Sequence, residues 1–380
     1  MIPLCNNHKI LHIYYEPFFS GISRHVLYSL KAIDNGKYNS VVLCSTGDVR
    51  IQTTLKINLG EDRVTIVGPG RFFSFSGFYQ TVRLMRTHKV GIVHIHNLQT
   101  VTWALPAAIL AGCRNLIFTP HVDNIGIGFL EPVTRKLIRL ARFIPLTFIA
   151  ISREQKKRIL DLGIAQPGKV KYIPNHISKH ELDEILHLNP GTIRSKNDIP
   201  QDAIVVSQVA RLNRQKDPHF LIRVAQLTRN QIPHILFLLI GDGPLKNELV
   251  QQINRHDLNA VVRLMGFRDD ARELLHASDI ATLTSRWEGL PYALLEAVYF
   301  KKPAVVTDIP GNREVIIDSE SGYLANTPEQ FAARLVELAR RKELRIAMGE
   351  AGYLRNKELF DCNHLASQMN AVYDQTKSEE

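Results

Sequence analysis

Two glutamates stand eight residues apart in the stretch EGLPYALLE, residues 288–296. The short apolar run before them is typical of a buried strand, and the run after Pro291 has a helical pattern, so Glu288 should lie in a strand-to-helix loop. Glu296 should lie about one turn into the helix, where its carboxylate could accept hydrogen bonds from a diol such as the ribose hydroxyls. A plainer interpretation also fits: one carboxylate balances the helix dipole and the other is solvated.

The residues that follow Glu288 suit a bound anion. Gly289 lets the backbone come close to a ligand because it has no side chain. Leu290 comes next, and Pro291 is favoured at the first position of a helix. Backbone N–H groups that are free at a helix start attract phosphate. We therefore predict that Gly289, Leu290 and Pro291 belong to a substrate-binding site.

Two cations lie five residues apart in the segment ARLNRQKDP, residues 210–218. Arg211 and Lys216 come just after a predicted strand and before a predicted helix. There they could clamp a diphosphate, with Arg211 acting as a planar fork and Lys216 as a point charge. For any single residue of this kind, a solvated loop cation is the commoner explanation.

Three further positions follow predicted strands. His121 ends the run NLIFTPH, Gly21 precedes the first predicted helix, and Gly243 lies in the glycine-rich turn GDGP. A lone histidine at a strand end is more often structural than catalytic, and each glycine is a weak signal by itself. Together with the pairs above, they predict phosphate or sugar contacts at several strand ends.

The elements that must position these residues alternate along the chain. Short apolar runs, rich in β-branched residues and bounded by Gly, Pro, Asn or Ser, predict strands at 9–15, 39–45, 91–97, 115–120, 146–152 and 170–175, and again at 203–210, 234–244, 261–267, 280–285 and 303–307. Amphipathic segments between them predict helices, among them 23–33, 217–228, 244–256, 270–278, 292–300, 328–356 and 364–375. This alternation is typical of βαβ units on parallel sheets.

The fold class predicted is therefore α/β, with two Rossmann-like doubly wound domains that face each other across a cleft. The boundaries predicted are an N-terminal domain at 1–186, a linker at 187–202, a C-terminal domain at 203–355, and a C-terminal helix at 356–380 that could cross back to the first domain. The linker is predicted because 187–202 has two prolines, a glycine and no apolar periodicity. Ligands of such sheets bind beyond the carboxyl ends of the strands.

Composition narrows the functional classes. Of 380 residues, 45% are hydrophobic and 22% charged, as in folded soluble proteins. Four scattered cysteines without a C-x-x-C pair argue against a disulfide framework or a zinc site and fit a reducing cytosol. The first residues lack the pattern of a signal peptide, and no apolar stretch is long enough to predict a membrane-spanning helix.

The positive charge is concentrated in one half. Residues 1–190 hold 23 Lys and Arg against 12 Asp and Glu, while the whole chain has a net charge of +10. An anionic partner of the first half is implied, either nucleic acid or a membrane surface.

Two segments of that half favour an anionic membrane. In 129–148 an apolar helical stripe is interleaved with Arg135, Lys136, Arg139 and Arg142, a pattern typical of an interfacial helix. Residues 71–89 add five aromatic side chains beside basic ones: Phe72, Phe73, Phe75, Phe78 and Tyr79 beside Arg83, Arg86 and Lys89. Both stripes could instead pack on the sheet with their basic edges in water.

As an ordered set, these motifs resemble the retaining glycosyltransferases of family 4, which have the GT-B fold. The resemblance runs almost from end to end, through SGISRHV, HIHN, PH at 120–121, AIS, IPN, ARLNRQKDP, IGDGPLKNEL, the unit 278–316 and SGYL. It is most specific in the second half. The sequence departs from the common family pattern in two places, where the implied ligand contacts are weaker. The first-helix loop has one glycine where two are frequent, and PGNRE replaces a more usual Gly-Gly pair.

The resemblance implies a role for each candidate. Glu296 would bind the ribose hydroxyls of a nucleotide sugar, and Glu288 would orient the donor sugar. Arg211 and Lys216 would neutralise the diphosphate leaving group. His121 would contact the sugar or the phosphate, and Gly21 would admit backbone N–H groups. The acceptor, held by the first domain, would be a lipid-linked or other glycan of surface polysaccharide or glycolipid assembly, and the enzyme would be cytoplasmic, at the inner face of the membrane.

No metal or cofactor is expected beyond a UDP- or GDP-sugar donor. The chain contains no D-x-D and no Cys/His cluster with ligand spacing along the sequence, and Arg211 and Lys216 offer charge instead.

Two other functions are weighed. A nucleotide-dependent oxidoreductase should show GxGxxG after its first strand, and this fingerprint is missing. A nucleic-acid-binding protein should interleave exposed aromatics with basic residues on a recognition fold, and none is evident.

Overall fold

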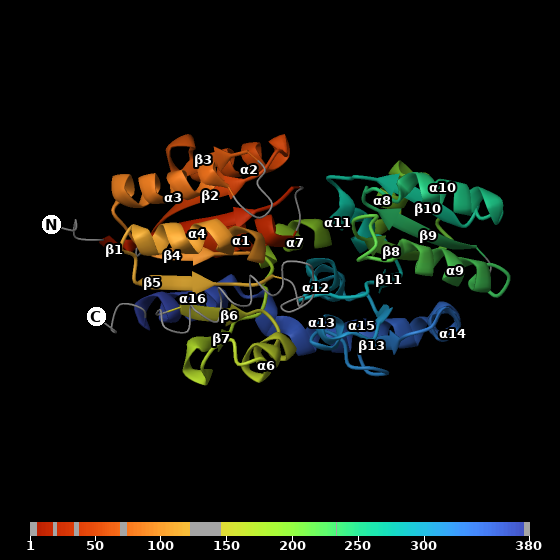
Figure 1. Ribbon diagram of the computed structural model, residues 1–380. Coiled ribbons are helices and arrows are strands. Elements are labelled where there is room, and N and C mark those ends of the chain that lie inside the picture. The colour runs from red at the N-terminus through yellow and green to blue at the C-terminus, as the bar shows by residue number, and fades with distance from the viewer. Residues whose placement is uncertain are drawn as a thin grey trace. The chain divides into compact units, whose positions relative to one another are not determined.

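The computed structural model describes residues 6–17, 21–33, 38–68, 74–121, 146–232 and 234–375 (Figure 1). The chain forms two compact units, one of residues 1–176 with 362–380 and one of residues 177–361. Each unit contains one sheet whose described pairings are all parallel.

The first unit has a seven-stranded sheet in the order β3-β2-β1-β4-β5-β6-β7. Its strands are β1 (Asn6–Tyr15), β2 (Asn39–Ser45), β3 (Val64–Val67), β4 (Val90–Ile95), β5 (Asn115–Phe118), β6 (Leu146–Ala150) and β7 (Val170–Tyr172). Its helices are α1 (Gly21–Ile33), α2 (Val49–Leu59), α3 (Phe75–His88), α4 (Leu98–Leu110), α6 (Arg153–Asp161) and α16 (Cys362–Gln375), with short 3₁₀ turns η1 (Glu61–Arg63) and η3 (Pro167–Lys169).

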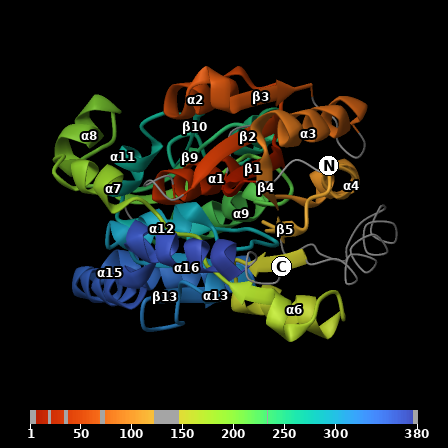
Figure 2. The same cartoon turned by 90° about the vertical axis from the view of Figure 1, so that its left-hand side faces the viewer.

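Strand alternation buries both faces of this sheet. Leu11 and Ile13 pack in the core formed with α3, α4 and α6, whereas Tyr14 packs in the core formed with α1 and α2. Successive side chains of a strand point to opposite faces, so each face needs its own helical layer. The helices on the two sides are seen in Figure 2.

The second unit has a six-stranded sheet in the order β10-β9-β8-β11-β12-β13. Its strands are β8 (Ile204–Val209), β9 (Ile235–Ile240), β10 (Val262–Gly266), β11 (Ile280–Leu283), β12 (Ala304–Thr307) and β13 (Gly322–Ala325). Its helices are α7 (Lys179–Leu186), α8 (Pro190–Lys196), α9 (Pro218–Thr228), α10 (Lys246–Arg255), α11 (Ala271–His276), α12 (Tyr292–Tyr299), α13 (Pro310–Arg313), α14 (Pro328–Arg340) and α15 (Lys342–Asn356), followed by the turn η4 (Lys357–Phe360).

The predicted fold class, two Rossmann-like α/β domains, is confirmed. Two short strands, β3 and β13, are missing from the sequence prediction. The single helix predicted at 328–356 is two helices, since Arg341 between them adopts φ −120° and ψ 87°, which is not helical.

The segment 187–202 is not an unstructured linker, because helix α8 lies within it. Asn189 caps this helix by accepting hydrogen bonds from the N–H groups of Gly191 and Thr192, and Pro190 takes its first position. Arg194 of α8 is buried and donates to the carbonyls of Ala203 and Ala277. The segment is therefore part of the second unit, and the change between units falls at residue 176.

The C-terminal helix α16 belongs to the first unit. It contacts α1, and the hydroxyl of Tyr373 lies 2.9 Å from Nδ1 of His94 in β4. The chain thus leaves the first unit after residue 176 and re-enters it at residue 362, as the blue ribbon of Figure 1 shows.

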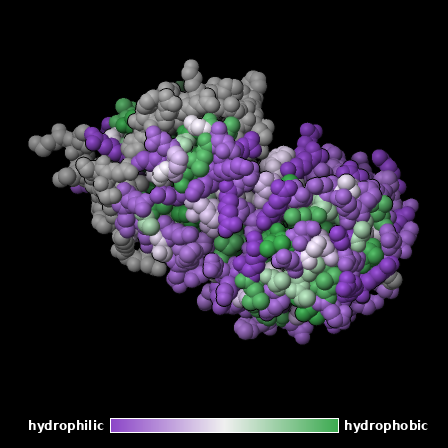
Figure 3. Space-filling model, turned by 90° about the horizontal axis from the view of Figure 1, so that it is seen from below, coloured by the Kyte–Doolittle hydropathy of each residue, from purple (hydrophilic) through white to green (hydrophobic). Residues whose placement is uncertain are grey.

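Among the described residues on the face drawn in Figure 3, hydrophilic side chains predominate, with groups of hydrophobic side chains between them. Among the helices described, none is both long and apolar enough to cross a membrane. The basic residues Arg135, Lys136, Arg139 and Arg142 lie outside the described residues.

Candidate active site

The predicted donor residues follow two neighbouring strands. In the second sheet the strand order reverses between β8 and β11, which pair in parallel. Arg211 and Lys216 lie in the loop after β8, and Glu288 lies in the loop after β11. In open α/β sheets, ligands bind outside the carboxyl ends of strands at such a switch point. The topology therefore brings the two predicted groups to one place.

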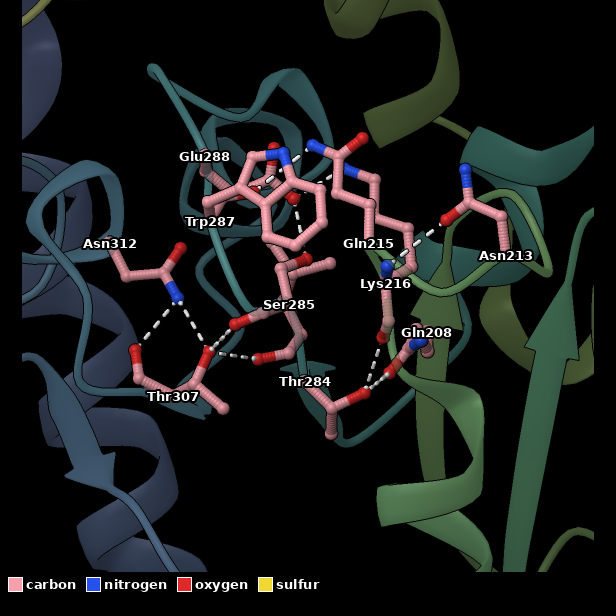
Figure 4. Close-up of polar contacts among 11 residues, drawn as sticks. Gln208, Asn213, Gln215, Lys216, Thr284, Ser285, Trp287, Glu288, Thr307 and Asn312 are labelled. Carbon is pink, nitrogen blue, oxygen red and sulfur yellow. Dashed lines mark hydrogen bonds and ion pairs between the residues drawn. The ribbon is translucent and has the colours of Figure 1, made fainter. Parts of the chain in front are cut away.

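Glu288 and Lys216 form an ion pair there (Figure 4). Only 6% of Glu288 is exposed, and Lys216 Nζ contacts its Oε1. The hydroxyl of Ser285 donates to the same carboxylate oxygen. A carboxylate that is buried, paired and hydrogen-bonded has a fixed orientation, so Glu288 is neither solvated nor merely a balance to the helix dipole.

Backbone contacts lock the two loops together. The N–H of Arg286 donates to the carbonyl of Gln215 over 2.8 Å, and the amide of Gln215 donates to the carbonyl of Trp287 over 3.0 Å. Asn213 Oδ1 accepts from the N–H of Lys216 at 3.0 Å. These bonds, drawn in part in Figure 4, hold Lys216 in position while leaving its ammonium group able to exchange partners.

Glycines allow the backbones around the site to approach closely. A Cβ on Gly243 would lie 2.3 Å from the carbonyl oxygen of Leu212, in the loop that carries both cations. A Cβ on Gly311 would lie 2.5 Å from the carbonyl oxygen of Gly289. Gly243 thus supports the cation loop, and the PGNRE segment supports the loop of Glu288.

Glu296 is buried in α12 and is held by Arg272 of α11. The two form an ion pair with Arg272 Nε 2.7 Å from Glu296 Oε1. Another nitrogen of the same guanidinium, Nη1, lies 3.1 Å from Glu181 in α7. Pro291 is the N-cap of α12, one residue before the predicted position, because the helix begins at Tyr292.

Arg211 is partly buried, and burial lowers the pKa of its guanidinium. Because an arginine is protonated far above neutral pH, it keeps its positive charge. Arg211 and Lys216 therefore lie in one loop, and Lys216 pairs with the buried carboxylate of Glu288. This arrangement can bind and stabilise an anionic leaving group.

His121 lies in the first unit, half-buried at the end of β5, within a group of histidines. Its ring stacks on His96, with centroids 5.6 Å apart, and meets the edge of His25, with centroids 4.4 Å apart. Burial, with a smaller contribution from His25, lowers the pKa of His121 well below its usual value. The ring is therefore neutral near pH 7 and offers hydrogen bonds, not charge.

Gly21 is the first residue of α1 and is exposed. Two residues later, the N–H of Ser23 donates to Glu16 over 3.0 Å, and the Ser23 hydroxyl contacts the same carboxylate oxygen. Because Glu16 is buried and follows β1, it occupies the helix start with a carboxylate. The structure therefore brings Gly21 near a protein anion, which any phosphate at this helix start would have to displace.

Several of these residues escape sequence reasoning. Ser285 carries a weak signal, since it ends a predicted strand three residues before Glu288. Arg272 and Glu181 carry none, because their contacts depend on how α7, α11 and α12 pack. The group of His12, His25, His94, His96 and His121 has no ligand spacing along the chain and is assembled by the sheet.

Comparison with known proteins identifies the family. Residues 19–181 match the family described as Glycosyltransferase Family 4, and residues 191–355 match Glycosyl transferases group 1. An amylovoran biosynthesis glycosyltransferase, AmsD of Erwinia amylovora, is 30% identical over 314 residues, which cover 79% of this chain and 84% of that protein. The chain is a family 4 glycosyltransferase.

This glycosyltransferase is also similar to a second curated protein and to a solved structure. The UDP-Gal:alpha-D-GlcNAc-diphosphoundecaprenol alpha-1,3-galactosyltransferase of Escherichia coli is 28% identical over 366 residues, 89% of each chain. The crystal structure of Anabaena Alr3699/HepE in complex with UDP and glucose superposes with a TM-score of 0.81 at 19% identity, covering 97% of this chain and all of that one. The fold is thus GT-B, and neither the oxidoreductase nor the nucleic-acid-binding alternative gains support.

Proposed function

We propose that this glycosyltransferase is a metal-independent, retaining enzyme that moves a sugar from a nucleotide-diphospho-sugar to a lipid-linked glycan. The observation that carries the proposal is the buried Lys216–Glu288 pair at the switch point of the second sheet. The pair supports the proposal because a cation suited to phosphate lies beside a carboxylate suited to sugar hydroxyls. The donor is a UDP- or GDP-sugar, and a UDP-sugar is favoured because a structural relative, HepE, was solved with UDP and glucose.

The leaving group is neutralised by Arg211 and Lys216. As the bond from sugar to phosphate breaks, negative charge develops on the diphosphate. Lys216 Nζ, which contacts Glu288 in the structure, exchanges part of this contact for a phosphate oxygen. Fixed charges that meet developing charge lower the barrier without reorganising at the moment of reaction. No divalent ion is then required for the transfer.

Glu288 and Glu296 bind different parts of the donor. Glu296, oriented by Arg272, accepts hydrogen bonds from the ribose hydroxyls. Glu288 orients the donor sugar. The acceptor attacks on the face that the diphosphate leaves, so the anomeric configuration is kept and no covalent enzyme nucleophile is needed. Gly289, Leu290, Pro291 and Gly243 shape the backbone around the donor.

The first unit holds the acceptor. His121 contacts the sugar or the phosphate as a neutral hydrogen-bonding group, because burial depresses its pKa. Gly21 lets backbone N–H groups approach the ligand at the start of α1.

A lipid-linked acceptor is supported by two relatives. The Escherichia coli relative is named for a diphosphoundecaprenol substrate, and the Erwinia relative for amylovoran biosynthesis. By analogy, this enzyme acts in surface polysaccharide or glycolipid assembly at the cytoplasmic face of a membrane.

Docking on an anionic membrane uses the basic half of the chain. Along helix α3, Phe75 is 81% and Tyr79 64% exposed, and Arg83 and Arg86 continue the exposed face at helical spacing. Aromatic side chains beside cations are typical of an interfacial helix. Arg135, Lys136, Arg139 and Arg142, from the basic amphipathic pattern at 129–148, are proposed to bind the same membrane.

Liposome sedimentation tests this surface. Each cation near an anionic membrane contributes roughly 1 kcal/mol, so replacing Arg135, Lys136, Arg139 and Arg142 by Gln should weaken binding by a few orders of magnitude. Replacing exposed Arg255, Lys301, Arg313 and Arg340 of the second unit is the matched control. Equal sedimentation of the two variants at moderate salt contradicts the proposal.

The function itself is tested with a panel of nucleotide sugars and a polyprenyl-diphosphate-linked sugar as acceptor. We expect one donor to release its nucleoside diphosphate only when acceptor is present, and NMR of the product to show the anomeric configuration of the donor. An inverted product, or no donor consumed with any acceptor of this class, contradicts it.

A further inference from the structure

The first sheet gathers five histidines at its own switch point. His12 lies in β1 and His94 in β4, directly paired across the two strands between which the strand order reverses. His96 and His121 follow β4 and β5, and His25 lies in α1. Four of the five are almost fully buried, and His121 is half-buried. Nε2 of His12 and Nε2 of His25 are buried without a hydrogen-bond partner among the described residues, which is unusual for buried polar atoms and points to a ligand.

We propose that His25, His96 and His121 form a binding site for Zn²⁺ or a similar first-row divalent ion. One ring nitrogen from each of the three lies within 4.8 Å of the other two. His96 Nδ1 and His121 Nε2 are 3.4 Å apart. That is long for a hydrogen bond, but two nitrogens bound at about 2.0–2.1 Å to a tetrahedral zinc are about 3.3 Å apart. Imidazole nitrogens are preferred ligands of zinc, cobalt and nickel.

The partner of His25 prepares this residue as a ligand. His25 Nδ1 lies 3.1 Å from Oδ1 of Asn175, an oxygen that can only accept. Nδ1 therefore carries the hydrogen, and Nε2 presents its lone pair. This Nε2 is buried and has no hydrogen-bond partner among the described residues. A histidine ligand whose other nitrogen donates to an amide oxygen is the usual arrangement around a metal.

The alternative trio of His12, His94 and His96 is less suited. Both nitrogens of His94 already contact hydroxyl groups, those of Tyr373 and Thr119, at 2.9 and 2.8 Å. His12 Nδ1 instead contacts His96 Nε2 at 2.9 Å, which leaves Nδ1 of His96 to face His121. His121 is the one ligand of the proposed site that is partly exposed, so the ion can enter beside it.

This ion is not part of the neutralisation of the leaving group, which is proposed to rest on Arg211 and Lys216 of the second unit, although its ligand His121 is also proposed to contact the sugar or the phosphate. Three protein ligands leave the fourth tetrahedral position to a water or a substrate oxygen. Binding of the ion is measured without donor or acceptor, so loss of this inference leaves the proposed function intact, and the reverse also holds.

Cobalt titration of the EDTA-treated, dialysed full chain tests the site. We expect one equivalent of Co²⁺ to produce the strong visible absorption of a tetrahedral complex, Zn²⁺ to displace it, and Mg²⁺ to leave it unchanged. Asn175→Ala should weaken binding about 10–100-fold, because it removes the hydrogen bond that orients His25. His25→Gln and His121→Asn, which remove ligands, should weaken it at least as much, and His234→Gln, at a side chain 69% exposed, not at all.

Circular dichroism establishes that each variant is folded before titration, and His121→Asn, at the half-buried ligand, serves if His25→Gln does not fold. The absence of a tetrahedral Co²⁺ spectrum in wild type would overturn the proposal. So would equal affinity in wild type and His121→Asn, which would assign the metal to surface histidines.

Discussion

At the switch point of the first sheet the buried polar groups are neutral imidazoles, whereas at that of the second sheet they are ion pairs. Burial lowers the pKa of His12 to about 3 and that of His25 to about 4, with smaller effects from neighbouring cationic groups on His12. In the second unit, Lys216 pairs with Glu288 and Arg272 with Glu296. One fold thus supports two electrostatic environments at equivalent strand ends.

The difference follows from what each unit is proposed to bind. A diphosphate leaving group needs positive charge close to it, which Arg211 and Lys216 are proposed to supply. A carboxylate beside them holds that charge in place. Burying such an ion pair costs less free energy than burying the cation without a partner. Hydroxyl groups of a sugar need hydrogen bonds, which the neutral imidazole of His121, the partly exposed member of the group, is proposed to supply.

The largest effect should come from the charged site. Glu288→Gln keeps the shape and can still accept a hydrogen bond from Lys216, but removes the negative charge. We expect the transfer rate to fall about 10²–10³-fold, as when one preorganised electrostatic contact is lost. The measurement is the initial rate of acceptor-dependent release of nucleoside diphosphate.

Glu350→Gln is the matched control, since Glu350 forms a half-exposed ion pair with Lys301 in the same unit. Its rate should stay near wild type. A turnover rate of Glu288→Gln equal to that of wild type would show that Glu288 does not belong to the active site.

The second effect should appear in the neutral cluster as the pH falls. The unfolded histidines bind protons below about pH 6.5, whereas His12 and His25 in the folded protein do so only near pH 3 and 4. Their depressed pKa values therefore favour folding above pH 6.5, and this stability is lost progressively as the pH drops. Each imidazole contributes up to about 1.4 kcal/mol per pH unit, or about 3 kcal/mol for these two between pH 7.5 and 5.5.

The two tryptophans separate the units in this experiment. Trp103 is buried in the first unit, and Trp287 lies in the second. Urea unfolding followed by Trp103 fluorescence, in a Trp287→Phe variant, should shift to lower urea between pH 7.5 and 5.5. The Trp287 signal of a Trp103→Phe variant should shift less. Equal shifts would show that the cluster does not govern acid sensitivity.

The smallest effect should come from Arg272, which pairs with Glu296 and is proposed to act on the donor only through it. Arg272→Lys keeps a charge but loses the planar fork that reaches both Glu296 and Glu181. We expect the KM for the donor to rise about 10-fold, which is about 1.4 kcal/mol, with kcat little changed.

Glu181→Gln, which removes only the outer contact of Arg272, should raise the KM less. A fall in kcat with an unchanged donor KM would contradict the positioning role of Arg272.

The sequence predicts the charged site better than the neutral one, for physical reasons. Glu288, Arg211 and Lys216 follow strands that alternate clearly with helices, and parallel strands end at one edge of their sheet. Arg272 is predicted only as part of a helix, because its contact with Glu296 depends on the packing of α11 on α12. The histidines come from β1, α1 and the ends of β4 and β5, so only the strand order reveals them as neighbours.

The sequence prediction fails at the boundaries of helices and domains. The linker at 187–202 is wrong because an Asn-Pro pair that caps α8 resembles a turn in sequence. Pro291 is the N-cap of α12, whereas the sequence predicts it at the first helical position, because the helix begins one residue later, at Tyr292. Both errors concern helix starts, where a polar residue or a proline fits a loop and a cap equally well.

One measurement tests most directly the claim that charged side chains of the second unit, and not a metal ion, neutralise the leaving group. Acceptor-dependent release of nucleoside diphosphate is followed in excess EDTA for wild type and for Lys216→Ala. We predict a wild-type rate unchanged by the chelator and a rate about 10²–10³-fold lower for the variant. Turnover that stops in EDTA and returns with Mg²⁺ or Mn²⁺, or a variant as fast as wild type, would contradict it.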